Sequence, residues 1–269
     1  MILVSIDGFR WDYPDRGASP NLKTLEDRGV RADGLIPSFP TKTFPTHYTM
    51  VTGLVPDRHG IVANTMWDPA FKVRFSPSKR AEVQDARWWG GEPVWVAAER
   101  AGMSTAHVFW VGTEAPISGL RPTHWLPFDG AMPYRERVDW ILERLDAPAE
   151  DRPGFMTLYF ALVDDVGHRN GADSPEVSDA IASVDRSIGR LLDGLDSRGL
   201  TGQTNVVIVS DHGMMQTSRE RVIFVDDYVD LADANPVDWN PVLALWPSEE
   251  DTPRVYRSLQ GAHPELGVY

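Results

Sequence analysis

The chain has 269 residues, of which 42% are hydrophobic and 24% are charged, and this composition is typical of a globular protein. Its formal net charge of −13 argues against a protein that binds nucleic acid or acidic membrane surfaces through a basic face. The chain contains no cysteine, which excludes disulfides, thiolate metal sites and a cysteine nucleophile. Any metal would therefore be held by histidine, carboxylate or hydroxyl groups.

Apolar strands and amphipathic helices alternate along the sequence. In chain order we predict a strand over 2–6, helices over 20–28 and 43–53, a helix over 93–101, a strand over 104–110, a helix over 134–145, a strand over 155–163, a helix from 175 and a strand over 204–209. The strands are apolar almost throughout, which is typical of strands buried on both faces. The sequence therefore predicts an α/β fold with a mainly parallel sheet and helices on both faces.

Two segments lie outside this alternation. Residues 68–91 are aromatic and charged without a clear period, and they are interpreted as an irregular insertion whose aromatic side chains either pack or bind a ligand. No run of about 18 apolar residues suggests a transmembrane helix, and the first residues enter the strand over 2–6 without the pattern of a secretory leader.

Carboxylates follow three of the predicted strands. Asp7 follows the first, Asp164 follows the strand over 155–163, and Asp211 with His212 follows the strand over 204–209. An aspartate after a strand is often only a turn or cap residue, and a single histidine is often structural. Three carboxylates at one edge of a parallel sheet, however, predict a metal site, since ligands bind beyond the carboxyl ends of the strands. His168, four residues after Asp164 in a predicted glycine-containing loop, can turn toward the same ion.

Threonine and proline crowd the segment before the predicted helix over 43–53. Thr43 stands where that helix begins, so it is either a helix cap or a hydroxyl nucleophile. A nucleophilic role is consistent with the position, because the N–H groups at a helix start bind phosphate oxygens.

Five short motifs occur in a fixed order along the chain. They are Asp7-Gly8-Phe9-Arg10, Thr43-Phe44-Pro45-Thr46-His47, His59-Gly60-Ile61, Asp164-x-x-Gly167-His168 and Ser210-Asp211-His212-Gly213-Met214. Together they resemble the nucleotide pyrophosphatase/phosphodiesterase family of the alkaline phosphatase superfamily, from residue 2 to about residue 230. The resemblance implies an alkaline-phosphatase-like fold and a hydrolase that binds two Zn²⁺ ions.

The resemblance also implies roles for single residues. The ligands of one zinc match Asp7, Thr43, Asp211 and His212, and Thr43 is also the nucleophile. The second zinc is matched by Asp164 and His168. Asn64 and the backbone N–H of Phe44 match groups that hold phosphoryl oxygens, and the rings of Phe44 and Tyr159 match walls of the substrate pocket, although ordinary packing remains an alternative for both rings.

The reaction that the resemblance implies is hydrolysis of phosphodiester or pyrophosphate bonds in nucleotide-type substrates, through a phospho-threonine intermediate. The partner is therefore a small phosphodiester or nucleotide. Two alternatives stay open: a phosphate monoester or phosphonate hydrolase of the same superfamily, and a metal-binding fragment without turnover.

The family has a third histidine ligand at its second zinc that this chain does not match. His263 resembles a segment that precedes that ligand, and the sequence ends at Tyr269 in what resembles a strand. We therefore predict a single catalytic domain over 1–269 that lacks its C-terminal part, with an incomplete second zinc site. The resemblance also implies a periplasmic or secreted protein, although no leader is recognised in this sequence.

Overall fold

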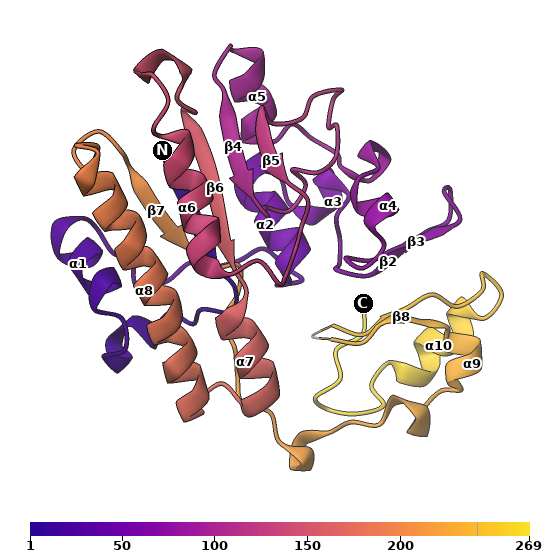
Figure 1. Ribbon diagram of the computed structural model, residues 1–269. Coiled ribbons are helices and arrows are strands. Elements are labelled where there is room, and N and C mark those ends of the chain that lie inside the picture. Colours follow the sequence, from indigo (N-terminus) through magenta and orange to yellow (C-terminus); the bar gives the residue numbers. More distant parts are fainter. Residues whose placement is uncertain (241) are drawn as a thin grey trace.

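The computed structural model describes residues 1–240 and 242–269 and centres on a five-stranded parallel sheet (Figure 1). Across the sheet the strands follow the order β5 (His124–Leu126), β4 (Thr105–Val108), β6 (Phe155–Phe160), β1 (Ile2–Ile6) and β7 (Val206–Val209). Ile6 is paired with Phe160, and Ser5 is paired with Val209. The strands β6, β1 and β7 thus end at nearly the same level, which brings the residues that follow them together. The parallel sheet with its helices confirms the predicted α/β class.

The predicted strand over 155–163 is too long at its C-terminal end. β6 stops at Phe160, and the helix α7 (Leu162–Asn170) begins two residues later. Leu162 and Val163 continue the apolar run of the strand, so composition alone does not reveal the change to helix. Asp164 and His168 consequently lie on a helix and not in the predicted loop.

Helices cover both faces of the sheet, as predicted (Figure 1). The first face packs against α1 (Pro20–Arg28), α6 (Tyr134–Arg144) and α8 (Pro175–Ser197). The second face packs against α2 (Thr43–Thr52) and α5 (Val94–Arg100), in a core rich in tryptophan. Side chains alternate along β1, so that Ile2, Val4 and Ile6 face the first layer while Leu3 faces the second.

The segment predicted as an irregular insertion contains regular structure. An antiparallel hairpin joins β2 (Met66–Asp68) to β3 (Val73–Phe75), and the short helices α4 (Arg80–Val83) and η2 (Ala86–Trp88) follow. Phe75, Trp88 and Trp89 are buried in the core of the second face. These three rings therefore pack and do not line an open ligand pocket.

The last forty or so residues form a small hydrophobic cluster of their own around Val229, Ala234, Val255 and Leu259. This cluster lies beside the hairpin β2–β3 (Figure 1). Among the described residues, two polar contacts connect this cluster to the rest of the chain: Lys42 pairs with Asp238, and Arg74 donates to the carbonyl of Val237. Residues 266–269 are not in a strand, contrary to the expectation from sequence.

The remaining elements are short. They are η1 (Tyr13–Arg16), α3 (Pro56–His59), η3 (Ala149–Asp151), η4 (Arg219–Arg221), η5 (Val225–Asp227), α9 (Leu231–Ala234), β8 (Pro236–Asp238), β9 (Ala244–Leu245) and α10 (Thr252–Leu259). Within the described residues, none of the helices combines the length and the apolar character needed to cross a membrane.

Candidate metal and phosphoryl-transfer site

The residues after β1, β6 and β7 converge at the carboxyl edge of the sheet. Asp7 comes directly after β1, Asp164 lies in the first turn of α7, and Asp211 with His212 comes after β7. Ligand atoms of Asp7, Asp164 and His212 all lie within 4.8 Å of one another. The structure thus brings Asp7 together with residues that lie more than 150 positions further along the sequence.

His212 lies at the centre of the carboxylates. Its Nε2 is 3.3 Å from Asp7 Oδ1, 3.3 Å from Asp211 Oδ2 and 3.9 Å from Asp164 Oδ1. The carbonyl of Gly213 accepts a hydrogen bond of 2.9 Å from His212 Nδ1. A backbone carbonyl on one ring nitrogen leaves the other nitrogen pointing toward the carboxylates, which is the usual arrangement of a histidine that binds a metal.

Burial makes this cluster of negative charges unfavourable without a cation. It raises the pKa of Asp7 to about 7, with a further contribution from the charge of Asp211, and it raises the pKa of Asp164 to about 6 together with Asp7. The pKa of Asp211 is also raised by burial. Burial by itself lowers the pKa of His212, but the surrounding carboxylates, Asp211 and Asp7 first, outweigh that effect and raise it.

Three carboxylate oxygens in the cluster lack a hydrogen-bond partner within the described residues. They are Asp7 Oδ1, Asp164 Oδ1 and Asp211 Oδ2. Leaving a buried oxygen unsatisfied costs about 1–3 kcal/mol, and more for a charged group. Oxygen and imidazole donors directed at one place fit a divalent cation such as Zn²⁺. The residues present therefore fit the metal that the sequence predicts.

His168 is at the outer side of this cluster. It lies one turn after Asp164 on α7, its Nε2 is 3.3 Å from Asp164 Oδ1, and its side chain is 58% exposed. Because residues four apart share one face of a helix, both side chains point to the same side of α7. Asp164 is thus positioned between His168 and His212.

Thr43 is the first residue of α2, which begins after Lys42 without a side-chain cap. The second residue of the helix, Phe44, donates its backbone N–H to Asn64 Oδ1 at 2.9 Å. This differs from the expectation that the N–H of Phe44 is free for a phosphoryl oxygen. The same bond fixes the amide of Asn64 by its oxygen and leaves its NH₂ group as the available donor.

The ring of Phe44 is half-buried and packs against Phe75 and Trp89, with ring centroids 5.7 and 6.3 Å away. Tyr159 differs more clearly from its predicted place in a pocket wall. It is only 8% exposed, and its hydroxyl donates a hydrogen bond of 2.5 Å to Asp7 Oδ2. Tyr159 therefore orients a carboxylate in this structure.

Sequence reasoning missed His47 and Ser5 as members of the site. The buried imidazole of His47 donates from Nδ1 to the carbonyl of Thr43 at 2.8 Å, since a carbonyl can only accept. Its Nε2 then accepts from the hydroxyl of Ser5 at 2.7 Å. Burial lowers the pKa of His47, which is consistent with this neutral form. His47 thereby connects the start of α2 to Ser5 on β1, and Ser5 lies two residues before Asp7.

His47 also approaches the carboxylates, because its Nδ1 is 3.6 Å from Asp211 Oδ2. A signal for His47 was present in the sequence: it stands one helical turn after Thr43 within a motif used for the resemblance. Its contact with Ser5, in contrast, depends on the packing of α2 on β1 and has no local sequence pattern.

The site thus combines carboxylates and a histidine at the carboxyl edge of a parallel sheet with a threonine at a helix start, and His47 contacts both parts. The sequence model of the family described as type I phosphodiesterase / nucleotide pyrophosphatase matches residues 1–269. The chain belongs to this family, which confirms the resemblance seen in the sequence.

Named relatives agree with this assignment. An uncharacterized pyrophosphatase/phosphodiesterase of Schizosaccharomyces pombe is 46% identical over 233 residues, which are 86% of this chain and 48% of the relative. Human ectonucleotide pyrophosphatase/phosphodiesterase family member 5 is 38% identical over 270 residues, 100% of this chain and 56% of the relative. The chain therefore spans about half the length of these curated relatives.

The solved structure of murine ectonucleotide pyrophosphatase/phosphodiesterase 5 has the same fold, with a TM-score of 0.94 and 38% identity. The match covers 100% of this chain and 72% of the murine one. A second murine structure, with a TM-score of 0.94 and 37% identity, is described as an inactive threonine-to-alanine variant in complex with AMP. These structures confirm the predicted fold class.

Proposed function

We propose that this chain carries the nucleophile and most of the metal ligands of a zinc-dependent phosphodiesterase that acts on nucleotide-type phosphodiester or pyrophosphate bonds. The observation that carries the proposal is a set of three buried carboxylate oxygens beside His212 that have no hydrogen-bond partner among the residues that the structure describes. Such a set needs a cation, and it lies at the edge of the sheet that Thr43 approaches through His47.

Two zinc positions are proposed. Asp7, Thr43, Asp211 and His212 are the ligands of the first. Asp164 and His168 are the two ligands that this chain offers to the second. When bound, the zinc ions supply positive charge that lowers the pKa of a hydroxyl and neutralises phosphoryl oxygens. His263 is not proposed as a ligand, and its Nδ1 accepts the backbone N–H of Glu265.

In the proposed reaction, the hydroxyl oxygen of Thr43 attacks phosphorus. The bond from phosphorus to the leaving oxygen breaks as the bond to Thr43 forms. Water then hydrolyses the phospho-threonine, which releases the phosphoryl group as a monoester and restores the hydroxyl. His47 fixes the backbone of Thr43 for attack, and Asn64 donates its NH₂ group to a phosphoryl oxygen.

The described relatives support the nucleotide as substrate class and a threonine as a necessary group. The murine threonine-to-alanine variant is described as inactive and as being in complex with AMP. AMP is the kind of monoester that hydrolysis of a nucleotide diester leaves behind.

The test is hydrolysis of bis-p-nitrophenyl phosphate and of p-nitrophenyl phosphate by the 269-residue chain, with zinc counted per chain. We expect faster turnover of the diester. Thr43→Ala should abolish turnover while zinc binding largely remains, and Thr43→Ser is the matched control because it keeps a hydroxyl. Turnover by Thr43→Ala would disprove the nucleophile, faster turnover of the monoester would favour a monoesterase, and zinc without turnover would favour a metal-binding fragment.

A further inference from the structure

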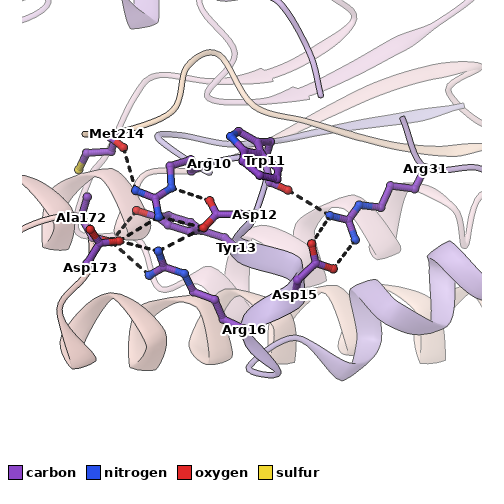
Figure 2. A network of polar contacts seen from close by, with 10 residues as sticks. All are labelled: Arg10, Trp11, Asp12, Tyr13, Asp15, Arg16, Arg31, Ala172, Asp173 and Met214. Atoms are coloured by element: carbon purple, nitrogen blue, oxygen red, sulfur yellow. Dashed lines mark hydrogen bonds and ion pairs between the residues drawn. The ribbon is translucent and has the colours of Figure 1, made fainter. Parts of the chain in front are cut away.

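Arg10 makes a network of hydrogen bonds with Asp12, Asp173 and Met214 (Figure 2). It lies three residues after Asp7, in the turn that follows β1. Its Nε is 2.5 Å from Asp12 Oδ1, and its Nη2 is 2.9 Å from Asp12 Oδ2. This two-point pairing with Asp12 fixes the plane of the guanidinium within its own turn.

The rest of the guanidinium reaches the two other segments that carry candidate ligands. Its Nη1 donates to the carbonyl of Met214 at 3.3 Å, two residues after His212. Its Nη2 donates to Asp173 at 2.9 Å, and Asp173 follows the helix that carries Asp164 and His168. Arg10 is thus bonded to the segments after β1, α7 and β7 at once.

These segments also pack without space for additional atoms. A Cβ on Gly167, between Asp164 and His168, would lie 2.2 Å from the sulfur of Met214. A Cβ on Gly8 would lie 3.0 Å from Asp164. Since the segments touch directly beside their ligands, a shift at Met214 is transmitted to α7 and to the residues around Asp7.

Arg16 and Tyr13 reinforce the same connection. Arg16 Nη2 is 2.7 Å from Asp173 Oδ1, and the hydroxyl of Tyr13 donates to the carbonyl of Ala172 at 2.9 Å. Both guanidiniums lie over the ring of Tyr13, at 5.1 Å for Arg10 and 4.4 Å for Arg16. Only Arg10 in this group also reaches the segment after β7.

We propose that Arg10 is a positioning residue for the metal site, which holds the segments carrying Asp7, Asp164 with His168, and Asp211 with His212 at the spacing that binds zinc. This inference rests on the proposed metal site and adds a residue that touches neither metal nor substrate. Removing the contacts of Arg10 should weaken zinc binding, because ligands that are held less firmly lose more freedom when they bind.

Arg31, which is also drawn in Figure 2, provides a matched control for Arg10. It makes a comparable two-point pair with Asp15, at 2.7 and 2.8 Å, and donates to the carbonyl of Trp11. Figure 2 shows that this pair lies beside the Arg10 network and that its drawn contacts stay within residues 11–31. Both arginines can be replaced by lysine, which keeps the charge but removes the planar two-point geometry.

The experiment measures zinc affinity by competition with a chelating dye for the unmodified chain and for Arg10→Lys, Arg31→Lys and Asp173→Asn. Melting temperatures are recorded without metal. We expect Arg10→Lys to weaken zinc binding by about 10- to 100-fold, the range for residues that support metal ligands. Asp173→Asn should weaken it less, and Arg31→Lys should leave it unchanged.

Equal zinc affinities for Arg10→Lys and Arg31→Lys would overturn the positioning role. The positioning role would also be overturned if zinc affinity fell in proportion to the melting temperature in all the variants. That result would mean that Arg10 contributes to stability alone. Absence of zinc binding by the unmodified chain would instead overturn the proposed metal site, and the inference with it.

Discussion

Two buried histidines on the second face of the sheet have different surroundings. His47 uses both ring nitrogens, toward Thr43 and Ser5, and lies beside Asp211. His107 on β4 is bonded at Nδ1 to Thr157, and its Nε2 has no hydrogen-bond partner within the described residues. Its neighbours are the rings of Trp95 and Phe155, and burial lowers its pKa to about 3.

The comparison separates two kinds of unsatisfied buried atom. The imidazole of His107 packs against aromatic rings, and within the described part of the chain its Nε2 has no hydrogen-bond partner. The free oxygens of Asp7, Asp164 and Asp211 instead lie around His212. An unpartnered polar atom therefore indicates a site when others converge on it, and burial of a titratable group does not do so alone.

The largest effect is expected where the carboxylates converge. Asp211→Asn removes the charge of a proposed ligand and should weaken zinc binding about a thousandfold or more, since even supporting residues contribute 10- to 100-fold. Competition titration with a chelating dye measures this change. His107→Leu is the control and should leave the affinity unchanged, while unchanged zinc affinity in Asp211→Asn would count against its role as a ligand.

In the metal-free chain, the carboxylate cluster and His107 should also affect the pH dependence of the free energy of unfolding in different ways. The unfolded chain ionises Asp7 near its ordinary pKa of 3.8, whereas the folded chain keeps the proton until about pH 7. The metal-free chain should therefore lose stability relative to Asp7→Asn as the pH rises from 4 to 7, by up to about 4 kcal/mol. Urea unfolding at several pH values measures this difference.

The buried His107 should show the opposite slope. Its pKa lies below the ordinary value of 6.5, so the unfolded chain binds the proton first as the pH falls. The chain should lose stability relative to His107→Phe as the pH falls below about 6.5. If the stability difference between the unmodified chain and Asp7→Asn stayed constant from pH 4 to 7, the raised pKa of Asp7 would be contradicted. A constant difference from His107→Phe below about pH 6.5 would likewise contradict the lowered pKa of His107.

A smaller effect is expected from the link between α2 and β1. His47→Leu removes both hydrogen bonds and should lower kcat for the diester by about 100-fold through misplacement of Thr43, with zinc stoichiometry retained. His107→Leu, a substitution of the same kind on the same face, should leave kcat unchanged. Steady-state kinetics with zinc counted in each sample tests this, and equal losses of kcat in both variants would remove the distinction.

The smallest effect is expected when the isolated histidine and its partner are replaced together. His107→Phe with Thr157→Val exchanges a polar pair for apolar groups of similar shape and should change the free energy of unfolding by less than about 1 kcal/mol. Thr157→Val alone leaves Nδ1 unsatisfied and should cost about 1–3 kcal/mol. Denaturant unfolding of both variants measures the difference, and a larger loss in the double variant would assign the pair a structural role.

Much of the fold could be predicted from the sequence because each element has a local pattern. The strand over 2–6 and the helix over 20–28 have the observed bounds, and the helix after Ser174 begins at Pro175 as its cap and proline predict. The end of β6 could not be predicted, because Leu162 and Val163 are as apolar as the strand before them.

The candidate site was predicted less completely, for a physical reason. Aspartates that follow strands converge because parallel strands end together, so Asp7, Asp164 and Asp211 could be grouped in advance. The contacts of Ser5 with His47 and of Arg10 with Met214 join segments far apart in the chain. Such contacts depend on how layers pack, and the local sequence carries no sign of them.

Through its pair with Lys42, the C-terminal cluster contributes to the electrostatic environment of Thr43, the proposed nucleophile. The side chain of Lys42 is 5% exposed, and its ammonium group pairs with Asp238, which is 196 residues further along the chain. A buried positive charge directly before Thr43 would be costly without that carboxylate. The counter-charge that neutralises the start of α2 is thus supplied by the hairpin β8–β9, and the potential felt by Thr43 depends on where that hairpin lies.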